Sequence, residues 1–405
     1  MNKVSERIAT IFDADNHYWE TSEAFTRHRS PEFAERGVYL VEIDGKSRYM
    51  FDGGRLHPII PGPGDVHMRP RPGALYEYFA GRSDKARLGD ELSCEPPSEH
   101  PEWFDRDARL RCMDEQGVEA AWLFPSQGVC MEGPMQPDVE ASIHILRAFN
   151  RWLDEDWGFA YQNRIFAAPF LTLSDVDRGV GELDWCLERG ARVVSVRNGP
   201  VFTTEGTKSP ADPVFDPFWA RVAEARVVVA PHAGFEDGYV GVTAAVAREW
   251  GRTTSSTGDS IDQYSTVISM LMKHRLVHDF AAILVADGLF ERHPRLRIAY
   301  IENGGTWVGD VLHGLQLLHG QNPGMFKTNP VDQFIEHCWV APFVEDSVPE
   351  LAKHLPVERI LFGSDWPHAE GVGHPRDFFK NVDGFSIDDQ RKIMRDNARE
   401  LTFAQ

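Results

Sequence analysis

Short apolar runs, each followed by a stretch with helical character, recur along this chain of 405 residues. The alternation limits the architectures open to the chain, because strands that alternate with helices form βαβ units and a parallel sheet. Most runs are rich in β-branched or aromatic residues, as expected for strands buried on both faces. The expected strands are Ile11–His17, Glu119–Pro125, Arg164–Leu171, Arg192–Asn198, Arg226–Ala233, Arg297–Gly304, His337–Phe343 and Arg359–Pro367.

The stretches between these strands carry helix start and stop signals. The helix expected over Trp103–Gln116 is followed by Gly117, and the helix over Ser174–Arg189 begins with a cap-like serine and aspartate and is followed by Gly190. The other expected helices are Val139–Trp157, one that opens at Asp212-Pro213, Gly305–His319, Asp346–His354 and Ile387–Leu401.

This pattern predicts an α/β protein with the (β/α)8 TIM-barrel fold, formed by residues 1–405 as a single domain. An open doubly wound sheet is the alternative, but no G-x-G-x-x-G motif follows the first strand. Two long insertions interrupt the pattern, at about residues 18–102 and 235–296, and Asp44-Gly45 in the first of them signals a β-hairpin. Both leave the C-terminal ends of strands, where barrel active sites lie, so we expect them to be lids or dimer arms.

Composition excludes several partners. A formal net charge of −20 and a pI near 5.2 argue against nucleic acid and anionic membranes, which both require basic patches. The five cysteines are scattered without a C-x-x-C pair, and no run approaches the roughly 20 apolar residues of a membrane span. We therefore expect a cytoplasmic protein with a small-molecule substrate, and a homodimer because that is the commonest symmetric state.

Polar residues end several of the apolar strands. Asp15 and His17 end the first strand, and they share a face because strand side chains alternate. His232 ends the fifth strand, Glu302 the sixth and Asp365 the eighth. Such a cluster of carboxylates would repel itself without a cation. Mixed imidazole and carboxylate ligands suit one divalent ion, Zn²⁺ first and Mn²⁺ or Fe²⁺ as alternatives, whereas Ca²⁺ prefers oxygen alone.

Each of these residues also has a structural interpretation. A strand-end aspartate such as Asp15 often caps the next helix, and a lone histidine often satisfies a local hydrogen bond. The metal hypothesis rests on four residues taken together, from three strands that are far apart in the sequence, namely Asp15, His17, His232 and Asp365.

The motifs IFDADNHYWE, APHAG, IENGGTW and FGSDWPH, in this order and at strand ends, resemble the amidohydrolase superfamily. The nearest branch is the amidohydrolase-related group that includes aminocarboxymuconate-semialdehyde decarboxylase and the resorcylate-type decarboxylases. The resemblance implies that His232 and Asp365 match the family's fifth-strand histidine and eighth-strand aspartate. Asp15 departs from the usual His-x-His pair toward its acidic variant, and Glu302 stands where these decarboxylases have a histidine.

Three further residues are candidates for the site. Glu302 could be an extra ligand or a general base. His368 could relay a proton because it lies just past Asp365, where the chain leaves the barrel mouth. His278 in the second insertion could replace the missing histidine, although a helix-surface role is the alternative. Arg197, at the end of the fourth strand, could clamp a substrate carboxylate or pair with an acid of the barrel mouth.

The preferred hypothesis is hydrolysis of a C–N, C–O or activated C–C bond in a small organic substrate by metal-activated water, with Asp365 or Glu302 accepting the proton. The second is non-oxidative decarboxylation of an aromatic or dienoic acid, with Glu302, His278 or His368 as the proton donor. The third is a degenerate barrel that does not catalyse.

Overall fold

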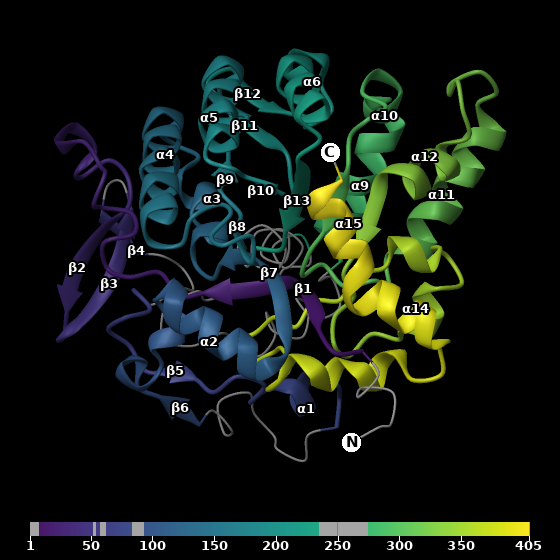
Figure 1. Cartoon of the computed structure of the whole chain (residues 1–405). Helices are drawn as coiled ribbons and strands as arrows, with labels where there is room; N and C mark the ends of the chain where they lie inside the picture. The colour runs from purple at the N-terminus through teal and green to yellow at the C-terminus, as the bar shows by residue number, and fades with distance from the viewer. Residues whose placement is uncertain are drawn as a thin grey trace.

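The computed structural model describes residues 8–51, 54–56, 62–82, 93–234, 249 and 274–404 (Figure 1). Its central strands form two parallel sheets, ordered β1-β7-β8 and β9-β10-β13-β14-β15. Residues 165–171 contribute one strand to each sheet and so join them along the chain. The strands are β1 (Ile11–Tyr18), β7 (Val118–Pro125), β8 (Ile165–Ala167), β9 (Phe170–Leu171), β10 (Val193–Arg197), β13 (Val228–His232), β14 (Ile298–Tyr300) and β15 (Cys338–Val340).

Six of the expected strands are present with shifted or shorter bounds; the one expected over Arg297–Gly304, for example, is reduced to Ile298–Tyr300. The other two differ more. The strand expected over Arg164–Leu171 is split at Pro169, which has no N–H to donate to a strand ladder. The eighth expected strand, Arg359–Pro367, makes only isolated bridges, from Ile360 to β15 and from Trp366 to Asn16 of β1. The described strands therefore do not form one closed sheet, although these two bridges connect the ends of the two sheets.

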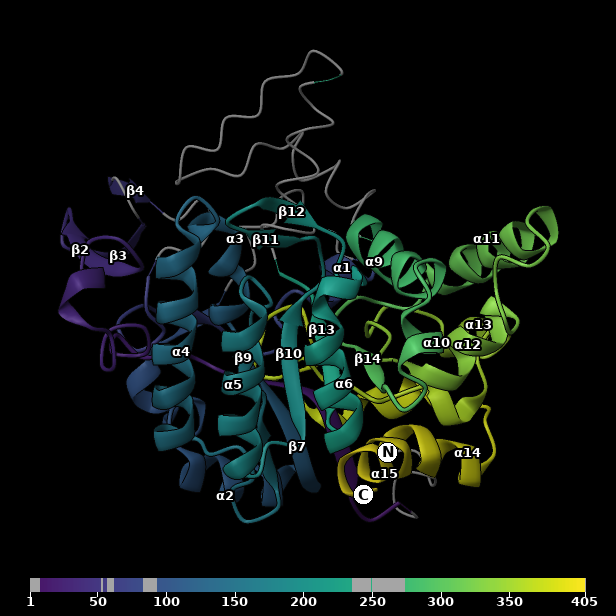
Figure 2. The ribbon, with the colours of Figure 1, turned by 90° about the horizontal axis from the view of Figure 1, so that it is seen from above.

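Helices cover the outer side of the strands, and in Figures 1 and 2 α4, α5 and α6 stand side by side over β9, β10 and β13. Aspartates cap several of them; Asp138 and Asp175, for example, each accept a backbone N–H of the first turn. The helices are α1 (Tyr76–Phe79), α2 (Arg106–Gln116), α3 (Glu132–Met135), α4 (Val139–Asp156), α5 (Val176–Glu188), α6 (Asp216–Ala225), α9 (Arg275–Ala286), α10 (Leu289–Arg292), α11 (Val308–Gln321), α12 (Pro330–His337), α13 (Val348–Leu351), α14 (Ile387–Arg391) and α15 (Asn397–Phe403).

The helix predictions hold in position but not always in length. The one expected over Asp346–His354 is the single turn α13, and the one over Ile387–Leu401 is interrupted by a π-helical turn at Lys392–Asp396. The Asp212-Pro213 start gives a 3₁₀ turn at Pro213–Phe215 directly before α6. None of the described helices is long and apolar enough to cross a bilayer.

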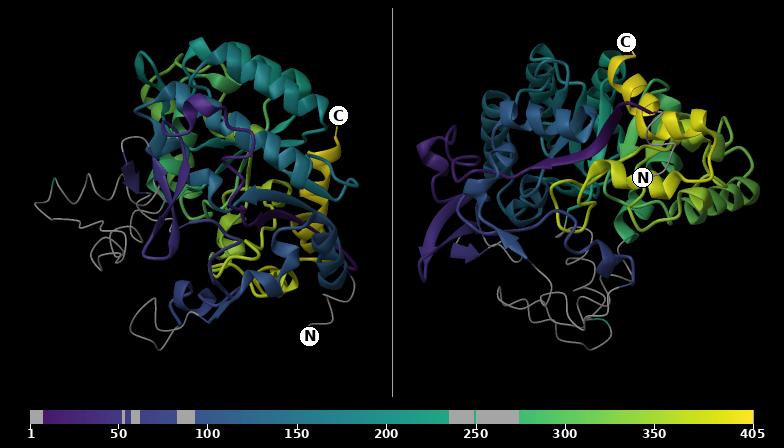
Figure 3. Two further views of the ribbon diagram at one scale, coloured as in Figure 1. Left: turned by 90° about the vertical axis from the view of Figure 1, so that its left-hand side faces the viewer. Right: turned by 60° about the horizontal axis from the view of Figure 1, so that its bottom comes forward.

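A small antiparallel sheet follows β1 and projects to one side of the molecule (Figure 3). It consists of β2 (Tyr39–Ile43), β3 (Lys46–Phe51) and β4 (Arg55–Leu56). Asp44 and Gly45 form the turn between β2 and β3 with φ of 52° and 71°, the left-handed conformation that a two-residue hairpin turn requires. Two short pairs also occur, of β5 (Arg69–Pro70) with β6 (Cys94–Glu95) and of β11 (Val201–Thr203) with β12 (Gly206–Lys208).

The second expected insertion, residues 235–296, is described from residue 274 onward and at residue 249, and the rest lies outside the described residues. Its described part forms α9 and α10, which continue the outer layer of helices. The expectation that the two insertions act as lids or dimer arms therefore stays a prediction.

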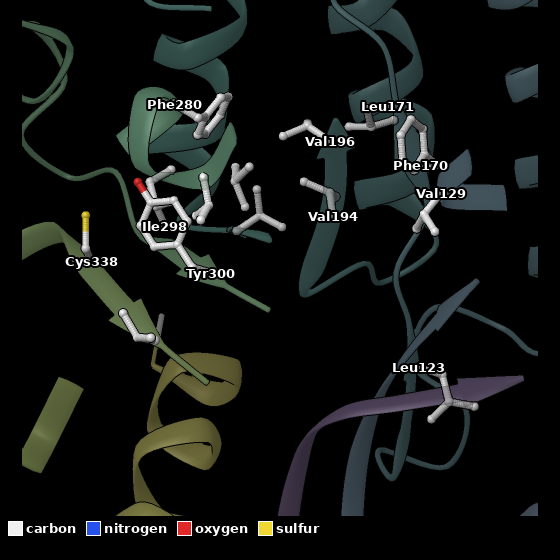
Figure 4. Close-up of a cluster of buried hydrophobic side chains, with 14 of the residues drawn as sticks. Leu123, Val129, Phe170, Leu171, Val194, Val196, Phe280, Ile298, Tyr300 and Cys338 are labelled. Carbon is white, nitrogen blue, oxygen red and sulfur yellow. The ribbon is translucent and has the colours of Figure 1, made fainter. Parts of the chain in front are cut away.

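The core has two layers, one on each face of the strands. Along β14, Ile298 and Tyr300 pack in the layer beneath the helices, while Ala299 lies in the inner layer with Phe12 and Trp122. Figure 4 shows part of the layer beneath the helices, with Val194 and Val196 of β10 beside Phe170 and Phe280. Burial on both faces explains why these strands are continuously apolar in sequence.

Candidate metal centre

Four side chains from three strands converge at the C-terminal ends of the strands. His17 Nε2 lies 3.3 Å from Asp15 Oδ1 and 3.3 Å from Glu302 Oε2. His232 Nε2 lies 3.2 Å from the same Glu302 oxygen and 3.6 Å from Asp15 Oδ1. One ligand atom from each of the four residues lies within 4.8 Å of the other three, which is close enough to surround a single cation.

Asp365 and His368 extend this group on one side. Asp365 Oδ1 lies 3.4 Å from His17 Nε2 and 2.6 Å from His368 Nδ1. The other ring nitrogen of His368 lies 2.7 Å from Ser126 Oγ, and Ser126 donates its own hydroxyl proton to the carbonyl of Tyr18. Because that proton is used, the ring of His368 must donate to Ser126 through Nε2–H.

Unusual backbone conformations turn two of the carboxylates toward this centre. Glu302 and Asp365 have φ of 52° and 55°, a left-handed conformation that is uncommon for residues other than glycine. Gly363 lies in the eighth expected strand, Arg359–Pro367, which we call the eighth segment. The glycine lets this segment approach β1, since a Cβ on Gly363 would lie 2.4 Å from the Cβ of Asp15. Strain of this kind gathers at functional sites, where the surrounding structure must hold it in place.

The donor atoms of the cluster fit a divalent metal ion. Asp15 Oδ1, His17 Nε2 and His232 Nε2 are all buried and have no hydrogen-bond partner among the described residues. Leaving such polar atoms buried and unsatisfied is costly, so an ion between them would explain their arrangement. His232 Nδ1 lies 2.8 Å from the carbonyl of Ala233, a contact that fixes the ring and directs Nε2 to the centre.

The protonation of these residues reflects an excess of buried negative charge. Burial alone would lower the pKa of His17, but Asp15 and Glu302 raise it to about 10. Burial, reinforced by the negative charge of Glu302, raises the pKa of Asp365 well above its usual range. Burial and the neighbouring charges of His17 and His232 lower the pKa of His368. A divalent cation would relieve the carboxylate repulsion that causes part of these shifts.

The structure thus brings together Asp15, His17, His232, Glu302, Asp365 and His368, all of which the sequence singles out. The side chains of two other candidates contact residues outside this group. The ring nitrogens of His278 on α9 lie 3.3 Å from Asp279 and 3.0 Å from Asp310 of α11. The guanidinium of Arg197 lies over the ring of Phe202 in β11 and donates to the carbonyl of Pro200.

Sequence reasoning missed the residues that support the centre from behind. Asp13 is fully buried, and burial raises its pKa to about 7. Arg109 of α2 is also fully buried and donates to Asn16 and to the carbonyl of His17. The one available signal was the position of Arg109, which shares the buried face of its helix with Met113 and Gln116.

Comparison with known proteins defines the class. The profile of the amidohydrolase family matches residues 12–402, and the chain belongs to this family. The resemblance drawn from the sequence motifs is thereby confirmed.

Among curated proteins, the gamma-resorcylate decarboxylase of Rhizobium radiobacter is 28% identical, over 73% of this chain and 86% of its own length. Among solved structures, an amidohydrolase from Mycobacterium avium subsp. paratuberculosis K-10 is 39% identical with a TM-score of 0.89, covering 97% of this chain and 99% of that one. A dihydroxybenzoic acid decarboxylase from Polaromonas sp. JS666, which holds manganese and the inhibitor 2-nitroresorcinol, shares the fold with a TM-score of 0.58 at 20% identity, over 83% and 97% of the two chains.

Proposed function

We propose that this protein is a metal-dependent, non-oxidative decarboxylase of an aromatic carboxylic acid. The observation that carries the proposal is the convergence of unpartnered His17 and His232 nitrogens with buried carboxylates, in a chain whose curated relatives include resorcylate decarboxylases. This reverses the order of the two hypotheses drawn from the sequence, in which hydrolysis came first.

We assign the metal ligands to Asp15, His17, His232 and Asp365. Glu302 contributes an oxygen within 3.3 Å of both histidine nitrogens, so it can join the ligand set or act beside it. Imidazole and carboxylate together suit one divalent ion, with Zn²⁺ and Mn²⁺ as the leading alternatives and Fe²⁺ as a third. Such an ion would supply an electrostatic anchor for the substrate's carboxylate and adjacent oxygen.

Decarboxylation requires a proton donor for the ring carbon. The C–C bond to the carboxylate breaks, carbon dioxide leaves, and the electron pair stays on the ring carbon, where a proton forms the new C–H bond. Glu302 is the proposed donor because its side chain is 17% exposed, more than those of Asp15 and Asp365 at 6% and 11%. His368, hydrogen-bonded to Asp365, is the proposed alternative donor.

The other two site candidates have weaker support. Arg197 pairs in register with His232 on the neighbouring strand, so it is a candidate clamp for the substrate carboxylate if it leaves the Phe202 ring. The contacts of His278 with Asp279 and Asp310 do not support a role in the reaction.

Hydrolysis is the second candidate function, and Glu302 is the observation that favours it. A carboxylate at this position is well suited to accept a proton from water during attack on a carbonyl. It is less suited than histidine to donate a proton at neutral pH.

We further propose that the central strands close into an eight-stranded barrel, with residues 360–366 as the eighth member. The bridges from Ile360 to Val340 and from Trp366 to Asn16 support this closure. We also propose a homodimer with the insertions as lids or arms. All five cysteines are free thiols, in keeping with the cytoplasmic location that we propose.

The deciding experiment incubates the metal-loaded protein with gamma-resorcylate and related hydroxybenzoates and measures both carbon dioxide and the phenolic product. We expect the wild type to release carbon dioxide. His232→Ala should lose both this release and the bound metal. Glu302→Gln should retain metal but lose about 10²–10⁴-fold in rate if Glu302 moves the proton. Hydrolysis of esters or amides without carbon dioxide release from any acid tested would support the second candidate and overturn the first.

A further inference from the structure

Four buried polar residues lie directly behind the candidate metal centre, and we call them the clasp: Asp13, Asn16, Arg109 and Ser364. Each is at most 2% exposed, and none is among the proposed metal ligands. Groups this deeply buried must satisfy their hydrogen bonds within the protein, so their contacts define how the neighbouring chain segments sit.

Asp13 is the centre of the clasp because both of its carboxylate oxygens connect β1 with the eighth segment. Oδ1 accepts the backbone N–H of Asp15 at 3.2 Å and that of Ser364 at 3.0 Å. Oδ2 accepts from the Asn16 side chain at 2.9 Å and from the Ser364 hydroxyl at 2.5 Å. Each oxygen therefore holds one group of Asp15 or its neighbour Asn16, and one group of Ser364, the neighbour of Asp365.

Arg109 completes the clasp from α2. It donates to Asn16 Oδ1 at 2.5 Å and to the carbonyl of His17 at 2.7 Å, and its guanidinium lies over the ring of Trp366. The side chain of Arg109 thus holds the backbone carbonyl of His17 and the ring of Trp366, the residue that follows Asp365.

Regular strand pairing is incomplete in this region. The register of β1 against β7 is interrupted between Asp13 and Asn16, the stretch that contains Asp15. The eighth segment joins β1 through one isolated bridge, between Asn16 and Trp366, and through backbone hydrogen bonds that include those from the N–H groups of Ser364 and Asp365 to the carbonyl of Asp15. The side-chain hydrogen bonds of Asp13 therefore add to an irregular set of backbone contacts between the two segments.

We propose that Asp13 is a positioning residue that sets the separation of Asp15 and Asp365 and thereby the affinity of the centre for its metal. The inference rests on the proposed function only in requiring that a metal binds. Outer partners of this kind typically change metal affinity 10–100-fold when they are mutated. Asparagine at position 13 keeps the size but presents an amide N–H₂ where one oxygen now accepts.

The test measures the dissociation constant for Mn²⁺ and for Zn²⁺, by competition with a chelator, and the melting temperature of the metal-free full chain. The matched control is Glu182→Gln. Glu182 is 4% exposed and accepts from Asn150 and Arg147, but it joins the outer helices α4 and α5. A merely structural role would lower the melting temperature in both variants and leave the dissociation constant unchanged.

We expect Asp13→Asn to bind metal 10–100-fold more weakly than the wild type, and Glu182→Gln to bind it as tightly. Ser364→Ala removes one donor to Asp13 and should weaken metal binding less than Asp13→Asn does. If Asp13→Asn does not fold, the affinity of Ser364→Ala tests the proposal instead. Wild-type affinity in Asp13→Asn, or in Ser364→Ala where only that variant folds, would overturn this inference alone. A wild type that binds neither metal would overturn the proposed function, and this inference with it.

Discussion

Gly363→Ala is the substitution for which the structure gives the clearest expectation. Gly363 lies where the eighth segment passes β1, and a Cβ added there would lie 2.4 Å from the Cβ of Asp15. This distance is about 1 Å shorter than the 3.4 Å at which ordinary contact begins. Both atoms are fixed to the backbone, so rotation of a side chain cannot relieve the clash and the two segments must separate.

The expected loss of stability follows from this separation. Forcing an extra methyl group into a packed site typically costs about 1–3 kcal/mol. The backbone N–H groups of Ser364 and Asp365 both bond the carbonyl of Asp15, at 3.1 Å and 2.8 Å, and separation would stretch them. Weakening one such buried bond adds about 1 kcal/mol, so we expect a total near 2–4 kcal/mol.

Urea denaturation of the metal-free protein measures this loss, and chelator competition measures the metal affinity, which should fall together with stability. The matched control is Gly181→Ala in the interior of α5. An added Cβ there meets nothing within 4 Å, so the variant should be more stable by about 0.5–1 kcal/mol. If Gly363→Ala retained wild-type stability and metal affinity, the close approach of the two segments would be wrong.

Three further predictions concern the centre and its surroundings. Removing metal with a chelator should lower the melting temperature and excess Mn²⁺ or Zn²⁺ should restore it, with about 2.7 kcal/mol gained at 100 times the dissociation constant. Arg109→Met should lower the free energy of unfolding by about 3 kcal/mol in urea denaturation, because two buried oxygens and the partly buried carbonyl of Glu102 lose their donor. Burial lowers the pKa of His144, whose Nε2 accepts from Ser30 N–H, so stability should fall as the pH drops below about 6.5. The melting temperature of His144→Gln should show less of this fall between pH 7 and pH 5.

Much of the fold follows from patterns within single segments. The apolar runs locate the central strands because strands buried on both faces are nearly continuously apolar, as in Val193–Arg197. The ends of α2 are marked by Asp105 and by Gly117, which has φ of 71°. The turn at Asp44-Gly45 is likewise encoded locally, by two residues that tolerate positive φ.

The deviations arise where hydrogen bonds leave the regular ladder. Pro169 cannot donate, and the N–H groups of Ser364 and Asp365 bond Asp13 and Asp15 instead of continuing a strand. An apolar run such as RILFGSDWP carries no record of those partners, since they lie about 350 positions away in the chain. Helix α12 was missed although Asn329 caps it and Pro330 opens it, which are recognisable start signals.

The site, like the fold, has a part that follows from patterns within single segments and a part that depends on contacts between distant segments. Asp15, His17, His232 and Asp365 could be selected from the sequence because strand ends of a parallel α/β fold meet at one edge, so topology alone brings them together. Arg109 lies on a helix, and the one local sign that its charge faces the strands instead of solvent is that it shares a helix face with Met113 and Gln116. Its role depends on tertiary packing, which places its guanidinium over the ring of Trp366.

At the seam between β1 and the eighth segment, backbone hydrogen bonds that could pair two strands instead position residues of the site. A regular ladder would use the N–H of Asp365 for an ordinary strand pair, but here it bonds the carbonyl of Asp15 while Asp365 adopts a φ of 55°. That arrangement directs the carboxylates of Asp15 and Asp365 toward the metal centre. It interrupts regular strand pairing and brings two negative charges close together. Asp13 and Arg109 offset part of this cost with buried hydrogen bonds, and a cation at the centre would offset the remaining repulsion. It follows that the seam, more than the outer helices, should loosen when metal is removed, and that hydrogen exchange at Ser364 and Asp365 should report it.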